Sequence, residues 1–139
     1  MKSGKSRLIL GAALAVCFSL SIVLSGCSDK SEEASYTQIS MEEAAKLMES
    51  EEDYIILDVR TIEEYESGHI PGAVCVPNET IGEEAVEELP DKEQMILIYC
   101  RSGNRSKQAA SKLVEQGYTN IYEFGGIIDW NGETAVGND

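Results

Sequence analysis

The 139-residue sequence predicts a single α/β domain built around a parallel sheet. Short apolar runs alternate along the chain with segments of helical periodicity. Three of the helical segments begin with an S/T-x-x-E capping box, in which each side chain accepts a hydrogen bond from the other residue's amide. Strands separated by helices are joined by βαβ crossovers, which make neighbouring strands parallel.

The elements follow from these patterns in chain order. Apolar runs predict strands at residues 36–39, 54–59, 73–76, 95–99 and 121–124. Helical periodicity and capping signals predict helices at residues 40–49, 61–67, 80–89 and 106–116. In a parallel sheet of this kind the ligand site lies outside the carboxyl ends of the strands.

Composition narrows the class of partner. The formal net charge is −14, which disfavours nucleic acid and anionic surfaces as partners. The four cysteines at positions 17, 27, 75 and 100 form no C-x-x-C pair and no zinc spacing. We therefore expect no metal and no cofactor.

Residues 1–26 have the pattern of a bacterial lipoprotein signal peptide. A basic start precedes residues 8–24, which are apolar apart from one glycine and two serines. The following Leu24-Ser25-Gly26-Cys27 resembles a lipobox, which is cleaved before the cysteine that becomes the lipidated first residue. An uncleaved transmembrane anchor and an ordinary secretory signal remain open alternatives. However, residues 8–24 are slightly short of the roughly 20 that a spanning helix needs.

In the lipoprotein interpretation, Cys27 carries a diacylglycerol and the protein is extracytoplasmic, tethered to the cell membrane. Residues 27–35 then form the lipidated cysteine and a flexible tether, and residues 36–130 form the domain, which we expect to be monomeric. Residues 131–139 lack a strong apolar pattern, so we expect this tail to fray.

Cleavage of the signal peptide would leave half of the remaining basic residues close in sequence to Cys100. Loss of three bases leaves 8 basic and 25 acidic residues, a formal charge of −17. Four of these eight bases lie close in sequence to Cys100, and they are Arg101, Arg105, Lys107 and Lys112. A second interpretation of the two lysines, as part of a solvated helix face, is equally acceptable.

The predicted site is the loop that follows the strand at residues 95–99. Cys100 lies between the carboxyl end of this strand and the amino end of the next helix, where backbone N–H groups converge on an anion. The helix amino terminus and the loop arginines favour the thiolate. Gly103 permits the positive φ that bends such a loop, and Asn104 tolerates it better than most residues.

Four stretches of the chain resemble the rhodanese-like domains. They are L-D-V-R at 57–60, E-Y-E-S-G-H-I-P-G-A at 64–73, Y-C-R-S-G-N-R-S at 99–106 and G-G-I-I-D-W at 125–130. The resemblance covers about residues 36–130. It implies a single α/β domain with a five-stranded, mainly parallel sheet and helices on both faces.

The resemblance also implies a sulfurtransferase. Cys100 would take a sulfane sulfur from a small anionic donor such as thiosulfate, hold it as a persulfide, and pass it to a thiol or cyanide acceptor. The expected site residues are the catalytic Cys100, the persulfide-binding loop of Arg101, Ser102, Gly103, Asn104 and Arg105, and the supporting Asp58, Arg60 and Ser106.

Three other functions compete with this one. A phosphatase or arsenate reductase would use a C-x5-R loop, whereas Cys100 to Arg105 is C-x4-R, a smaller loop that suits a sulfur atom. A non-catalytic interaction module is the second alternative, and the intact cysteine loop argues against it. The third is a thiol redox protein that uses Cys75, at a position where related sequences often have asparagine.

Three polar residues near the predicted site have structural interpretations. Asp58 is expected to bind neighbouring backbone, and Arg60 to pair with Glu64. His69, the only histidine, is expected to be a turn and packing residue, because an ionised thiol needs no general base.

Overall fold

The computed structural model describes residues 35–138, which contain a five-stranded sheet with strand order β1-β5-β4-β2-β3. All the paired strands of this sheet run parallel, as the sequence predicts. The strands are β1 (Thr37–Gln38), β2 (Tyr54–Asp58), β3 (Val74–Cys75), β4 (Met95–Cys100) and β5 (Ile121–Gly126). Within residues 35–138 no helix is long and apolar enough to cross a membrane, and the predicted signal peptide and Cys27 lie outside this range.

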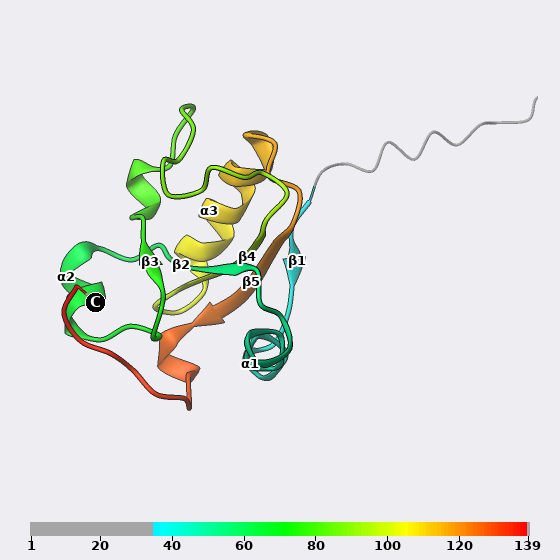
Figure 1. The fold of residues 1–139 in the computed structure, drawn as a ribbon. Coiled ribbons are helices and arrows are strands. Elements are labelled where there is room, and N and C mark those ends of the chain that lie inside the picture. The colour runs from blue at the N-terminus through cyan, green and yellow to red at the C-terminus, as the bar shows by residue number, and fades with distance from the viewer. Residues whose placement is uncertain (1–34, 139) are drawn as a thin grey trace, which may run out of the picture. The chain divides into compact units, whose positions relative to one another are not determined.

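Helices cover both faces of the sheet (Figure 1). The helices are α1 (Met41–Ser50), α2 (Ile62–Ser67) and α3 (Asn104–Glu115), with short 3-10 turns at η1 (Asn78–Thr80) and η2 (Ile127–Asp129). Helix α3 packs on one face, where Ala109, Ala110 and Leu113 meet Ile98 and Leu57. On the other face α1 contributes Ala44 to a second cluster. The fold prediction of a parallel α/β domain is therefore confirmed.

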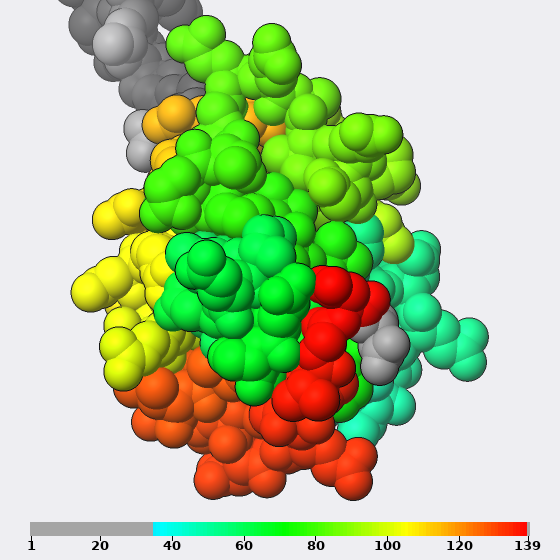
Figure 2. Space-filling model, turned by 90° about the vertical axis from the view of Figure 1, so that its left-hand side faces the viewer, coloured from blue at the N-terminus to red at the C-terminus, as the bar shows by residue number. Residues whose placement is uncertain are grey.

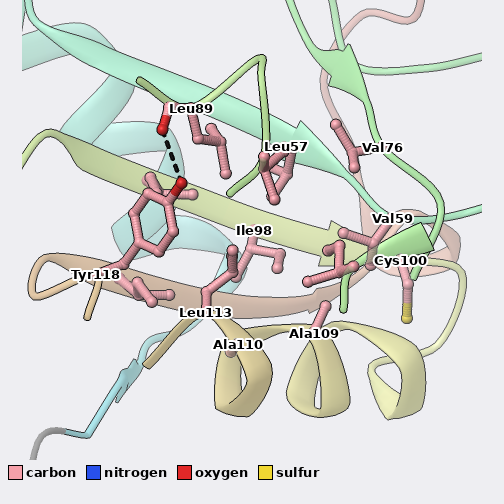
Figure 3. Packing of buried hydrophobic residues seen from close by; sticks show 14 residues of the cluster. Leu57, Val59, Val76, Leu89, Ile98, Cys100, Ala109, Ala110, Leu113 and Tyr118 are labelled. Atoms are coloured by element: carbon pink, nitrogen blue, oxygen red, sulfur yellow. Dashed lines mark hydrogen bonds between the residues drawn. The ribbon is translucent and has the colours of Figure 1, made fainter. Parts of the chain in front are cut away.

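Cys100 belongs to the core cluster on the α3 side of the sheet. Ile96 and Ile98 of β4 are fully buried in it, and Cys100 is 1% exposed. Figure 3 shows Cys100 at the end of this row of side chains that is nearest the start of α3. Because β4 is a central strand, the position of the thiol is fixed by packing on both sides of the sheet.

The predicted helix at residues 80–89 is absent. The S/T-x-x-E pattern at Thr80 forms no capping box, because the Thr80 hydroxyl donates instead to the carbonyl of Pro77 at 2.7 Å. Residues 81–94 cross the domain as turns and bends, and Ile81 and Leu89 are buried in the core. The Tyr118 hydroxyl fixes this segment by donating to the Leu89 carbonyl at 2.7 Å (Figure 3).

The C-terminal tail is ordered, so the prediction that it frays is wrong. Ala135 and His69 exchange two backbone hydrogen bonds, of 2.8 and 2.9 Å, as an antiparallel bridge. The amide of Gly137 donates to the Glu66 carbonyl at 2.9 Å. Figure 2 shows the C-terminal segment, in red, lying against the green segment that includes α2. The tail therefore gains its order from α2 and the residues after it, and not from any apolar pattern of its own.

Candidate active site

The amino terminus of α3 is directed at the Cys100 thiol. Gly103 is the N-cap of α3, with φ 101°, and no side chain caps this helix. Its amide donates instead to Cys100 Sγ at 3.0 Å. The positive φ is the conformation expected for Gly103, whereas Asn104 is already the first helical residue and does not need the left-handed region. The thiol thus occupies the place that a capping side chain normally takes.

The hydrogen bonds around Cys100 favour its thiolate. Burial is the largest single influence, and alone it would raise the pKa of the thiol. The Ser106 hydroxyl and the backbone amides of Ser106, Gly103 and Ser102 together outweigh burial, and the pKa of Cys100 lies below its ordinary value. A group of N–H donors that stabilises a thiolate also stabilises the terminal anion of a persulfide.

The loop rests on a glycine of β5. Cys100 pairs with Gly126 in the sheet, and the register between β4 and β5 shifts at this point. A Cβ on Gly126 would overlap the carbonyl oxygen of Arg101 and lie 2.5 Å from Ser102 Cα. The second glycine of the G-G-I-I-D-W stretch therefore permits the close approach of two backbones beneath the loop.

The two loop arginines have different surroundings. Arg105 forms a two-pronged ion pair with Glu64 of α2, with N–O distances of 2.7 and 2.9 Å. The Arg105 guanidinium, followed by that helix's own Thr61 amide, lowers the pKa of Glu64 to about 2, although partial burial opposes the shift. Arg101 is exposed, as are Ser102 and the side chain of Asn104. Arg105 thus connects the loop to α2, and Arg101 faces solvent at the rim of the site.

Lys112 does not contribute to this rim. Its amino group donates to the carbonyl of Asn78 at 2.8 Å and to the Asn78 side chain at 3.1 Å. Lys107 is exposed on the first turn of α3. Arg101 in the loop and Lys107 on the first turn of α3 are therefore the exposed bases that follow Cys100.

Asp58 and Arg60 form a buried structural pair. Arg60 donates to both carboxylate oxygens of Asp58, with its closest contact at 2.6 Å, and to the Gly68 carbonyl at 2.7 Å. The Tyr99 hydroxyl donates to the same carboxylate at 2.7 Å. The predicted pairing of Arg60 with Glu64 is wrong, because Asp58 binds Arg60 and Glu64 binds Arg105. Both Asp58 and Arg60 have their polar groups occupied within the fold.

His69 lies in the packing beneath α2. It is fully buried, its Nδ1 lies 2.9 Å from the Tyr65 carbonyl, and its ring stacks on Tyr65 at 3.7 Å. This environment agrees with a turn and packing role.

The two cysteines of the described region lie on opposite faces of the sheet. Cys100 belongs to the cluster under α3, whereas Cys75 packs against the cluster on the α1 side. Strand β2 separates their strands, so their Cα atoms are about 10 Å apart, beyond the roughly 7 Å limit for a disulfide. Burial, followed by the nearby Asp58, raises the pKa of Cys75 to about 11. A direct disulfide between Cys75 and Cys100 therefore requires the backbone to move.

One residue of the site has no signal in the sequence. Glu123 is a buried acid on β5, 3% exposed, and its Oε1 accepts from the Ser106 hydroxyl at 2.6 Å. The strand pattern of residues 121–124 predicts only alternate burial, so it cannot show which polar group Glu123 meets. The contact arises because β5 and α3 both lie beside β4.

Comparison with known proteins assigns this arrangement to a family. Residues 40–133 match the family described as the rhodanese-like domain. The chain belongs to the rhodanese-like family. The cysteine loop at the carboxyl end of β4 is its candidate active site.

Relatives of this chain include proteins whose names refer to sulfur chemistry. The putative sulfur carrier protein YrkF of Bacillus subtilis (strain 168) is 40% identical over 102 residues, which are 73% of this chain and 54% of YrkF. The chain thus spans about half the length of that relative. The thiosulfate sulfurtransferase GlpE of Pseudoalteromonas translucida is 36% identical over 96 residues, 68% of this chain and 89% of GlpE.

A solved structure described as rhodanese with anions from E. coli has the same fold. It superposes with a TM-score of 0.56 at 33% sequence identity. The match covers 60% of this chain and 99% of that one.

Proposed function

We propose that the protein is a sulfurtransferase that carries sulfane sulfur as a persulfide on Cys100. The observation that carries this proposal is the uncapped amino terminus of α3, whose Gly103 amide donates to Cys100 Sγ at 3.0 Å. This environment stabilises an anionic sulfur and leaves the thiolate as a nucleophile. The sulfurtransferase name of a relative at 36% identity supports the same reaction.

The reaction has two steps. The Cys100 thiolate attacks the outer sulfur of thiosulfate, the S–S bond of the donor breaks, and sulfite leaves with the electron pair. The Cys100 persulfide anion remains within the amides of Ser102 and Gly103. A thiolate or cyanide acceptor then attacks the terminal sulfur, and Cys100 leaves as the thiolate. In this proposal Arg101, exposed at the rim, attracts the anionic donor, and Arg105 fixes the loop to α2.

The geometry gives less support to a phosphatase. The C-x4-R loop brings Arg105 into contact with the Glu64 carboxylate of α2, so its guanidinium is already occupied. A phosphate-binding arginine would have to leave that ion pair. Sulfur transfer needs no such change.

We further propose that the domain works outside the cytoplasm, held at the membrane by a lipid on Cys27. The basic start, the apolar residues 8–24 and the lipobox-like Leu24-Ser25-Gly26-Cys27 support this location. Metabolic labelling with a fatty-acid analogue tests it in bacterial cells. Label should appear on the chain and disappear with Cys27→Ser, and label that persists in this variant contradicts lipidation at Cys27.

The sulfur-transfer proposal is tested by the intact mass of the full chain after incubation with thiosulfate. We expect a gain of one sulfur atom, lost again when cyanide is added with release of thiocyanate. Cys100→Ser should gain no sulfur, whereas Cys75→Ser should gain it as the unaltered chain does. The absence of an adduct from thiosulfate and from other sulfane donors would support a non-catalytic binding module.

A further inference from the structure

Glu123 is a buried acid beside the site, and the proposed two-step reaction gives it no role. Its side chain is 3% exposed, and Oε1 accepts from Ser106 Oγ at 2.6 Å and from the amide of Gly125 at 2.9 Å. A buried carboxylate is costly unless hydrogen bonds compensate it. Both partners here are donors, so they satisfy acceptor positions of the buried carboxyl group.

The Ser106 hydroxyl has one hydrogen and several acceptors around it. Its oxygen lies 2.6 Å from Glu123 Oε1, 2.9 Å from the Gly103 carbonyl and 3.4 Å from the Gly125 carbonyl. The same hydroxyl is one of the groups that lower the pKa of Cys100. A serine can donate only one hydrogen bond at a time, so these acceptors compete. The shortest of the contacts, to Glu123, has the length of a charge-assisted hydrogen bond.

We propose that Glu123 is a positioning residue that holds the Ser106 hydroxyl toward β5 and thereby restrains the ionisation of Cys100. This inference rests on the proposed reaction at Cys100 and adds a regulator of its nucleophile. The carboxyl group acts by occupying the hydroxyl hydrogen, which is then not available to the thiolate.

Restraint of this kind favours sulfur transfer. A thiolate loses intrinsic nucleophilicity as its pKa falls, and the best attacking thiol has a pKa near the ambient pH. The α3 amides and Arg105 pull the equilibrium toward the thiolate. Glu123 opposes them by holding the Ser106 hydroxyl, at 2.6 Å from its Oε1.

The remaining charges near Cys100 are already paired or are exposed to solvent. Glu64 of α2 is bound to Arg105, and Asp58 and Arg60 at the end of β2 neutralise each other. Arg101 is exposed in the loop itself. Among these groups Glu123 alone contacts a hydroxyl that also interacts with the thiol, so its removal should have a distinct effect.

The test is the pH dependence of Cys100 alkylation by iodoacetamide in the full chain, read by mass spectrometry on the Cys100-containing peptide. In Glu123→Gln we expect the midpoint to fall by about half a pKa unit, which gives about threefold faster alkylation below the midpoint. The Cys75 peptide serves as an internal reference. Glu115→Gln, which removes an exposed acid of α3, is the matched control and should leave the midpoint unchanged.

Ser106→Ala shows whether Glu123 acts through the hydroxyl. We expect this variant to raise the Cys100 midpoint, and Glu123→Gln to have a smaller effect in the Ser106→Ala background than alone. Equal effects in both backgrounds would contradict a role through Ser106. An unchanged or raised midpoint in Glu123→Gln would overturn the proposal altogether.

A folding measurement and a second variant distinguish a specific effect of Glu123 from loss of the fold. Circular dichroism establishes that each variant is folded, and Glu123→Asp replaces Glu123→Gln if the latter is not. The shortened carboxylate weakens the contact with Ser106, so its midpoint should also fall. The alkylation profile does not depend on sulfur transfer. If thiosulfate leaves no sulfur on Cys100 but the midpoint shifts as expected, the proposed function fails and the role of Glu123 stands.

Discussion

The amino termini of α1 and α2 differ from that of α3 in what binds their free amides. Ser40 and Glu43 close a complete capping box on α1, and Thr61 and Glu64 do the same for α2. Helix α3 has Gly103 at this position and no side-chain cap. Its amides are left for Cys100.

The difference distinguishes helix termini that stabilise the fold from a helix terminus that serves the reaction. A capping box satisfies the helix amides within the helix itself, and its effect is to hold the local fold. An uncapped terminus next to a thiol uses the same amides to stabilise an anion that forms and disappears during a reaction. Glu64 belongs to both systems, because it caps α2 and also binds Arg105 of α3.

The largest effect is expected from a substitution that moves the loop before α3 and so separates its amides from Cys100. In Gly126→Ala the new Cβ overlaps the Arg101 carbonyl, so the loop amides must shift away from Cys100. Loss of hydrogen bonds to a charged group costs about 1.5–3 kcal/mol, which corresponds to tenfold or more in thiolate population. We expect at least about tenfold slower alkylation of Cys100 at neutral pH.

A glycine with open surroundings provides the control for that variant. A Cβ on Gly82 meets no atom within 4 Å. Gly82→Ala should therefore leave both the alkylation rate and the free energy of unfolding nearly unchanged. If Gly126→Ala behaves like Gly82→Ala, the contact between β5 and the loop does not position the amides.

A capping box should affect stability without affecting the thiol. In Ser40→Ala the Glu43 amide loses its 3.1 Å hydrogen bond to the Ser40 hydroxyl. We expect the free energy of unfolding, measured in urea, to fall by about 1 kcal/mol, with no change in the alkylation profile of Cys100. Ser50→Ala, at the other end of α1, is the matched control and should have little effect. A shift of the Cys100 midpoint in Ser40→Ala would argue against separate roles.

The shared residue Glu64 should have a smaller effect that depends on pH. The pKa of Glu64 is lowered to about 2, so the stabilisation is present above the ordinary value of 4.5 and is lost as the pH falls toward 2. At neutral pH we expect Glu64→Gln to lower the free energy of unfolding by about 0.5–1 kcal/mol, because the pair is partly exposed.

Urea unfolding between pH 7 and pH 3 measures this dependence. The difference between the unaltered chain and Glu64→Gln should shrink as the pH falls. Glu63→Gln, on the same first turn of α2, removes an acid that is exposed to solvent, so its effect on the free energy of unfolding should be smaller at pH 7. A difference that stays constant down to pH 3 would contradict an ion pair with Arg105.

The sequence is most informative where the interactions are local. The capping boxes at Ser40 and Thr61 join residues three apart, and both form as predicted. The similar pattern at Thr80 fails, because Gly82 within the pattern disfavours a helix and the core binds Ile81 and Leu89 in another conformation. The predicted α/β fold and the position of Cys100 beside the start of α3 follow from the pattern of apolar runs.

Contacts between distant segments were beyond this kind of prediction. The tail is ordered by the pairing of Ala135 with His69, 66 positions earlier, and no pattern within the tail indicates it. The partners of Arg105 and Ser106, namely Glu64 and Glu123, come from α2 and β5. These contacts depend on the order of strands in the sheet, which local periodicity does not specify.

The activation of Cys100 by the α3 amides is tested by comparing Cys100 with Cys75 in the same molecule. Iodoacetamide labelling of the full chain over a range of pH, read separately on each cysteine peptide, gives the two midpoints. We predict a midpoint for Cys100 below that of an ordinary thiol, and one for Cys75 near the pKa of about 11 that its burial and Asp58 impose. In urea the two should converge. Coincident midpoints in the folded protein, or labelling of Cys75 at the lower pH, would contradict the claim that the α3 amides activate Cys100.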